Sequence, residues 1–149
     1  MAIYSPRASG LGNSAAYQVS GIPYASASIQ TPVLSETPYE HSFPFVTKFV
    51  TITNTTTGAN IPLRVGFSAL GITGSVESGT PASPPPPGAS DHYFILDNGE
   101  SYTGEFRVSR LYFLSDQFPS APTVSIIAGM TGIPSADLTT NWSGSAGVG

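Results

Sequence analysis

Histidine and carboxylate side chains are the residues of this sequence suited to acid–base or metal chemistry, and they are few. His41 directly follows Glu40, and His92 directly follows Asp91. Hydrolytic catalysis needs an activated nucleophile beside a base, or two facing carboxylates, and the sequence has neither pattern. A histidine at the start of a strand is ordinarily a hydrogen-bonded structural residue. We therefore predict no catalytic residue, no metal or cofactor site, and a protein that is not an enzyme.

Other polar residues with suggestive spacing have structural explanations. Asp97 and Glu100 flank an Asn-Gly pair, which is typical of a type I′ hairpin turn. No cluster of Asp and Asn has the spacing of a calcium loop. Glycosylation sequons begin at Asn54 and Asn141, but no signal-peptide pattern precedes them. We expect both sequons to be chance matches in a chain rich in serine and threonine.

The composition indicates a single domain with unusually few charges. Charged residues make up 9% of the 149 residues, the net charge is −4, and cysteine is absent. A typical globular protein has about a quarter charged residues. A surface with so few charges does little to oppose association, so we expect large contacts with other subunits. The alternative is a stable monomer whose surface is rich in serine and threonine.

Charge pattern and hydropathy argue against two kinds of partner. The five basic residues are scattered along the chain, so we predict no direct nucleic-acid binding. No window approaches the run of about eighteen apolar residues that a membrane helix needs, so we predict no membrane span.

Alternating apolar residues predict an all-β sandwich with negligible helix. The central segment is residues 42–54, which we expect to form one long strand that is partly apolar on both faces. Such a strand needs cover from a second sheet on one side and from another layer or another subunit on the other. Further strands are expected at residues 15–20, 24–31, 61–68, 92–96, 102–114 and 122–129.

The same pattern predicts two hairpins and one change of sheet. Residues 42–54 should pair with residues 61–68, and the Asn-Gly turn should join 92–96 to the strand that begins at residue 102. After residue 110 the alternation gives way to a run that is apolar on all sides. This change indicates a bend where the strand passes from one sheet to the other, or a surface that another subunit covers.

Aromatic side chains support an alternative class of function. Exposed rings on a β-sandwich can stack on sugars, as in a carbohydrate-binding or receptor-binding module. Five phenylalanines at regular strand positions are expected in the core, namely Phe43, Phe45, Phe67, Phe94 and Phe106. The aromatic residues placed to meet a partner are Tyr4, Tyr17, Tyr24, Tyr39 and Trp142.

Five segments together resemble one family. They are YQVSGIPY at 17–24, FPFVTKF at 43–49, LRVGFS at 63–68, YFIL at 93–96 and SIIAGMTGI at 125–133. The combination resembles the single jelly-roll penton proteins of large icosahedral double-stranded DNA viruses of eukaryotes. The resemblance extends over nearly the whole chain and implies a single jelly-roll β-sandwich of two antiparallel sheets.

The expected organisation is one domain between two arms. Residues 15–133 should form the jelly-roll domain, with a long Gly/Pro-rich loop at 69–90. Residues 1–14 should be a Gly/Ser-rich N-terminal arm, and residues 134–149 a Gly/Ser-rich C-terminal tail. The proline run inside the loop is typical of a stiff spacer.

The resemblance implies a structural role. Five copies would close each capsid vertex as a homopentamer, in contact with the double jelly-roll major capsid protein and with minor capsid proteins. The protein would be made in the cytoplasm of the host cell and would reside at the capsid vertex of the virion. The family supplies no catalytic residues. Another minor jelly-roll capsid or decoration protein is a further alternative.

Apolar residues beyond the needs of one sandwich core are the candidate subunit contacts. They lie on the second face of the long strand and in the apolar run after residue 110, and the two arms add three more. The candidate contacts are Tyr4, Arg7, Val46, Val50, Ile52, Leu111, Phe113 and Trp142.

Overall fold

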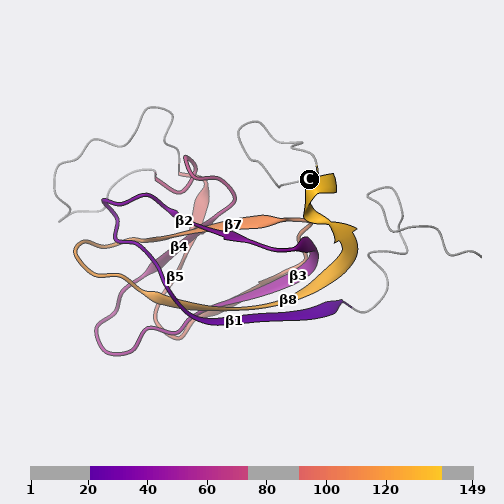
Figure 1. Ribbon diagram of the computed structural model, residues 1–149. Coiled ribbons are helices and arrows are strands. Elements are labelled where there is room, and N and C mark those ends of the chain that lie inside the picture. The colour runs from indigo at the N-terminus through magenta and orange to yellow at the C-terminus, as the bar shows by residue number, and fades with distance from the viewer. Residues whose placement is uncertain (1–20, 74–90, 139–149) are drawn as a thin grey trace, which may run out of the picture.

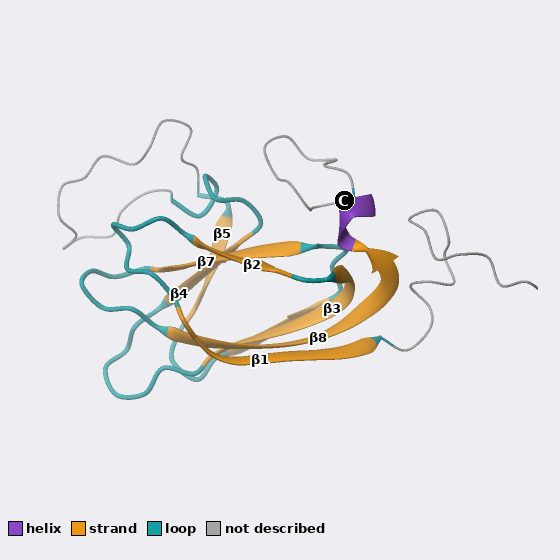
Figure 2. Cartoon of the chain, in the orientation of Figure 1, coloured by secondary structure: helices purple, strands orange, loops and turns teal. Residues whose placement is uncertain are grey.

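The chain forms a sandwich of two antiparallel β-sheets, which confirms the predicted all-β fold (Figure 1). The structure is a computed structural model, and it describes residues 21–73 and 91–138. Strands account for nearly all of its regular structure (Figure 2), and η1 is a single 3-10 turn. The elements are β1 (Ile22–Gln30), β2 (Tyr39–Ser42), β3 (Phe45–Asn54), β4 (Leu63–Gly66), β5 (Tyr93–Leu96), β6 (Ser101–Gly104), β7 (Arg110–Ser115), β8 (Thr123–Pro134) and η1 (Ser135–Asp137).

Several predicted features lie outside the described residues. They are the strand at 15–20, both arms except for the start of the C-terminal one, most of the Gly/Pro-rich loop, and the side chains of Tyr4, Arg7, Tyr17 and Trp142. These expectations stay predictions.

Most strands pair with strands that are distant in the sequence. One sheet has the order β1-β8-β3-β6, and the other has the order β2-β7-β4-β5. The 12-residue β8 lies between β1 and β3 and pairs with both, so it is a central strand of its sheet. Among the described strands, β4 and β5 are the consecutive pair that stays in one sheet, whereas all other consecutive strands lie in opposite sheets.

Pro44 divides the long strand that the sequence predicts at residues 42–54. β2 ends at Ser42 and β3 begins at Phe45, and these two strands lie in different sheets. Proline has no backbone N–H to donate to a ladder, which favours a break at this position. The prediction of one continuous strand is therefore wrong at its first residues.

Neither predicted hairpin forms, because β3 and β4 lie in different sheets and so do β5 and β6. The turn after β5 does exist, with the Glu100 N–H donating to the Asp97 carbonyl (2.9 Å). Gly99 has a φ of 78°, but Asn98 has a negative φ. A type I′ turn needs positive φ at both central residues, so this turn lacks the twist that holds hairpin strands together.

The chain does change sheets in this region, since β6 and β7 belong to opposite sheets. The predicted single strand over 102–114 is, however, two strands, and the change of sheet lies between residues 104 and 110, before the apolar run. β7 is apolar on all sides because the same chain covers both of its faces. Leu111 and Phe113 enter the main core between the sheets. On the opposite face, Tyr112 and Leu114 pack with Ile72.

The main core fills the space between the two sheets and draws on both of them. Its buried members are Phe43, Val50, Ile52, Leu63, Val65, Leu96, Val108, Leu111, Phe113, Val124, Ile126, Ala128 and Met130. Phe45, Phe67, Phe94 and Phe106 pack against this core. Of the five phenylalanines predicted to be core, Phe43 is therefore buried in it, and the other four are half-buried at its margin.

Adjacent isoleucines on β8 provide a matched test of which face is buried. Ile126 is 1% exposed and joins the core, while Ile127 is 57% exposed. Ile126→Ala should lower the free energy of unfolding by about 2–5 kcal/mol, because it removes packed atoms and leaves a cavity. Ile127→Ala should change it by less than about 0.5 kcal/mol. Urea unfolding followed by circular dichroism measures both, and equal losses would contradict this orientation of β8.

Candidate functional site

The apolar residues predicted to contact other subunits lie inside the sandwich. All five are 0% exposed, namely Val46, Val50, Ile52, Leu111 and Phe113. Val46 packs with Ile133 and Leu138 in a small cluster of its own, and the other four belong to the main core. Their burial corrects the prediction that they form a contact surface. A strand covered by its own chain has the same apolar pattern as one covered by a neighbour.

The outer face of the sheet β1-β8-β3-β6 presents mostly neutral side chains. The four strands contain one charged residue, Lys48. Ala25, Ile127, Thr51 and Thr103 are neighbours in register across the middle of the sheet. With 57% of its surface exposed, Ile127 is the most exposed large apolar side chain among the described residues.

Hydroxyl pairs on this face satisfy one another. Thr51 Oγ1 lies 2.8 Å from Thr103 Oγ1, and Thr53 Oγ1 lies 2.7 Å from Ser101 Oγ. Such cross-strand pairs stabilise the sheet and leave fewer polar groups that depend on water. The face is therefore suited to contact with another neutral surface.

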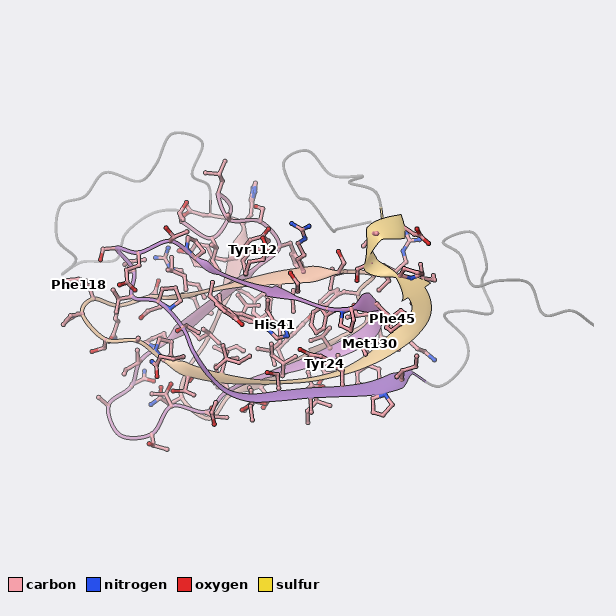
Figure 3. All side chains as sticks on the ribbon, in the orientation of Figure 1. Tyr24, His41, Phe45, Tyr112, Phe118 and Met130 are labelled. Atoms are coloured by element: carbon pink, nitrogen blue, oxygen red, sulfur yellow. The ribbon has the colours of Figure 1, made fainter. Side chains whose placement is uncertain are left out.

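His41 lies in an aromatic cluster between the edge strands of the two sheets (Figure 3). It belongs to β2 and is 5% exposed, and its Nε2 lies 2.9 Å from the hydroxyl of Tyr24 on β1. The rings of Phe43 and Phe113 lie 5.0 and 6.5 Å from its own. Burial lowers the pKa of His41 below its ordinary value. His41 is thus a hydrogen-bonded histidine, as predicted, and it joins the two sheets at one edge.

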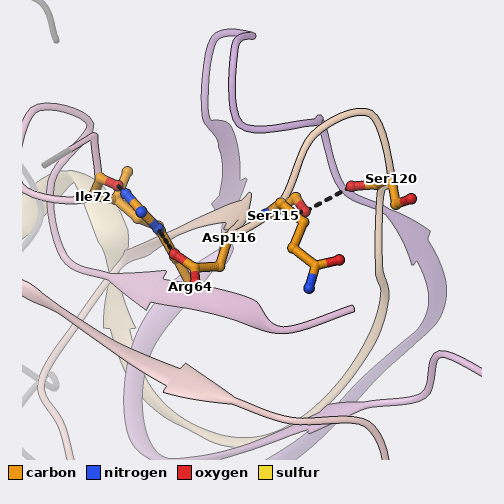
Figure 4. A network of polar contacts seen from close by, with 6 residues as sticks. Arg64, Ile72, Ser115, Asp116 and Ser120 are labelled. Atoms are coloured by element: carbon orange, nitrogen blue, oxygen red, sulfur yellow. Dashed lines mark hydrogen bonds and ion pairs between the residues drawn. The ribbon is translucent and has the colours of Figure 1, made fainter. Parts of the chain in front are cut away.

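Arg64 forms a buried ion pair that the sequence reasoning missed (Figure 4). Its side chain is 0% exposed, and its Nε donates to Asp116 Oδ1 (2.5 Å). Its Nη1 donates to the carbonyl of Ile72 (3.2 Å), and its guanidinium lies 4.3 Å from the centre of the Tyr93 ring. The one available signal was an arginine inside an otherwise apolar strand, on the face opposite Leu63 and Val65. That cation connects β4, β5, the segment after β4 and the end of β7.

Asn54, the first residue of one sequon, is buried and its side chain links three backbone segments by hydrogen bonds. It is 0% exposed, and its Nδ2 donates to the carbonyls of Ile61 and Leu96, both at 3.0 Å. Its Oδ1 accepts a hydrogen bond from the Thr56 N–H (3.1 Å). A buried and fully engaged amide is closed to glycosylation in the folded chain. The sequon at Asn141 lies outside the described residues.

The acidic residues and histidines do not gather into a metal site in residues 21–73 and 91–138, where no group of three or more could hold an ion. Over the same part of the chain, no helix has the length and hydropathy to cross a membrane. The Glu100 carboxylate accepts the Asp97 N–H (2.9 Å), so these two acids serve the turn. The predictions of no enzymatic activity and no cofactor stay predictions.

The chain matches no protein family, no curated protein and no solved structure with which it was compared. The resemblance to penton proteins therefore rests on the five sequence segments alone. Function has to be argued from the strand pairing, the surfaces and the hollows of this fold.

Asp116→Ala should be strongly destabilising, because it leaves the Arg64 guanidinium buried without its partner. We expect a loss of about 3–5 kcal/mol in the free energy of unfolding. Arg110→Ala is the control, because the side chains of the Arg110–Glu40 pair are 42% and 40% exposed and such pairs contribute about 0–1 kcal/mol.

A double variant separates charge burial from packing. Replacing the pair by Arg64→Met and Asp116→Leu should recover most of the loss, since apolar side chains of similar volume can replace a buried ion pair. Urea unfolding of the three variants provides the comparison. A loss in Asp116→Ala no larger than in Arg110→Ala would contradict the buried pair.

Buried His41 should make the fold less stable in mild acid. Its pKa is lowered in the folded chain, so the unfolded chain takes up a proton first as the pH falls below about 6.5. This contribution to stability is complete above that pH and is lost as the pH falls toward the lowered pKa. His41→Phe should flatten the dependence, whereas His92→Gln, at an exposed histidine, should keep it. Urea unfolding at several pH values between about 7.5 and 5 tests this, and an unchanged slope in His41→Phe would contradict it.

Proposed function

We propose that the sandwich is a single jelly roll and that the protein is a structural subunit of a capsid. The observation that carries the proposal is the strand pairing. β1 pairs with β8, β2 with β7, β3 with β6, and β4 with β5, which are the pairs of one long antiparallel ribbon. Rolling such a ribbon brings β3 beside β8 and β4 beside β7, and these are the two remaining pairs of the sheets.

The place of the subunit is the one that the resemblance implies, a capsid vertex closed by a homopentamer. A closed ring of identical subunits needs two different patches on each copy, because its contacts run head to tail. We assign one patch to the neutral face around Ile127, which a neighbouring copy can cover without burying a charge. Tyr4, Arg7 and Trp142 remain candidate contacts to a neighbouring copy or to the other capsid proteins.

A free-standing carbohydrate-binding or receptor-binding module is the alternative. The two described tyrosines that were expected to contact a ligand, Tyr24 and Tyr39, give this alternative little support. Tyr24 packs edge-on against Phe43 and bonds to His41, so its ring is not an open platform. Tyr39 is 37% exposed, and the centre of its ring lies 6.1 Å from that of the His41 ring. A structural subunit therefore accounts better for the neutral sheet face.

Assembly can be measured on purified protein and on particles. Native mass spectrometry should detect an assembly with five times the 15.4 kDa chain mass, and proteomics should find the protein in purified virions. Ile127→Lys should weaken assembly at least about tenfold without changing urea stability, because it places a charge in the contact. Ile95→Lys is the control, since Ile95 is 43% exposed but belongs to the other sheet.

Two outcomes would overturn the proposal. One is a wild-type chain that stays monomeric and is absent from particles. The other is an assembly that tolerates Ile127→Lys as well as Ile95→Lys, which would remove the neutral face from the contact.

A further inference from the structure

A hollow of about 300 Å³ lies at the ends of β4 and β5. Its walls are Val65, Phe67, Asp91, His92, Tyr93 and Phe94. Phe67 and Phe94 are half-buried and pack against the main core, so two rings form an anchored apolar wall. Asp91 and His92 are exposed and supply polar atoms at the rim. The volume is at the lower end of the range for small-molecule sites, about 300–1,000 Å³.

A strip of rings continues from this hollow across the open edge between β5 and β6. Phe94 lies 4.8 Å from Tyr102, and Tyr102 lies 6.1 Å from Phe106 with the two rings within 14° of parallel. Phe106 in turn meets Phe67 edge-on at 5.3 Å. Tyr102 remains 41% exposed. Four rings from both sheets are therefore held in fixed positions beside an open hollow.

We propose that this hollow binds a neutral hexopyranose, as a free sugar or as the terminal unit of a glycan. The C–H face of a pyranose packs on aromatic surface, and the exposed parts of Phe67 and Phe94 line the hollow. The hydroxyls of a sugar are donors that an ionised carboxylate such as Asp91 accepts strongly. The His92 imidazole adds a second polar group at the same rim. This site does not rest on the capsid role, because a soluble module would use it equally.

The chemistry of the walls selects against other ligands. An anion would meet the Asp91 carboxylate, and no Lys or Arg is among the described residues that line the hollow. A purely apolar molecule would cover the exposed side chains of Asp91 and His92 without offering them a hydrogen bond. A neutral polyol with one apolar face can pack that face on the phenylalanine rings and direct its hydroxyls to the polar rim.

Nuclear magnetic resonance titration of the labelled full chain tests the site. The probes are the methyl glycosides of glucose, galactose, mannose, N-acetylglucosamine and fucose, each added to about 50 mM. At least one should cause saturable shifts at Phe67, Asp91 and Phe94, with a Kd on the order of 1–10 mM for a single sugar ring. Asp91→Ala and Phe94→Leu should each weaken that binding about tenfold.

Control variants away from the hollow and two competing ions test whether binding is specific to the hollow and to sugars. Asp137→Ala removes an exposed acid elsewhere, and Tyr39→Leu removes an exposed ring at the opposite edge, so both should leave the Kd unchanged. Because Asp91 is exposed, Asp91→Ala should fold normally even if Phe94→Leu does not. The proposal is overturned if no glycoside gives saturable shifts, or if the shifts lie outside the hollow. It is also overturned if Asp91→Ala binds like the wild type, or if tetramethylammonium or inorganic phosphate binds there more tightly than every sugar.

Discussion

The ion pair between Arg64 and Asp116 is the interaction on which the outer layer of the sheet β2-β7-β4-β5 depends. Removing a guanidinium from water costs several kcal/mol, so a buried arginine is tolerated only when its partners are fixed around it. Asp116 supplies the opposite charge, Ile72 a carbonyl and Tyr93 a ring face. These partners come from the end of β7, the segment after β4, and β5. The same face carries the apolar cluster of Ile72, Tyr112 and Leu114. The Arg64 cation and this small core together hold the segment after β4 against the sheet.

The two open edges of the sandwich are joined by different chemistry. At the edge between β1 and β2, the hydrogen bond between Tyr24 and a buried His41 connects the sheets, and the ring of Tyr39 remains 37% exposed. At the edge between β5 and β6, ring contacts connect them, and Tyr102 keeps 41% of its surface exposed beside a hollow. Opening the edge between β1 and β2 would break this hydrogen bond and leave the buried His41 without that partner. An edge held by ring contacts alone has no such penalty, and the proposed sugar site lies beside it.

Alternation along the chain predicted the all-β class, the two sheets and the crossing between β6 and β7, because side-chain direction has a period of two in every strand. It did not predict partners. An Asn-Gly pair favours a tight hairpin locally, yet the pairing of β5 with β4 and of β6 with β3 decided the geometry. The assignment of Val50 and Ile52 to a subunit contact failed for a related reason. Apolar residues must be covered, but nothing in their pattern says whether the cover is the chain's own second sheet or another molecule.

The distribution of charge over the two sheets has a direct physical consequence. In one sheet, β2 and β7 carry the partly exposed pair Glu40 and Arg110, and β4 carries the buried Arg64, whereas the other sheet carries Lys48 alone. Covering a charged face with another protein removes hydration from each charge, and only well-placed partners restore that loss. Covering the face around Ile127 removes water from methyl groups and from hydroxyls already bonded to one another. Contact through this face would therefore bury apolar area with little opposing desolvation, whereas contact over β2 and β7 would desolvate the Glu40–Arg110 pair.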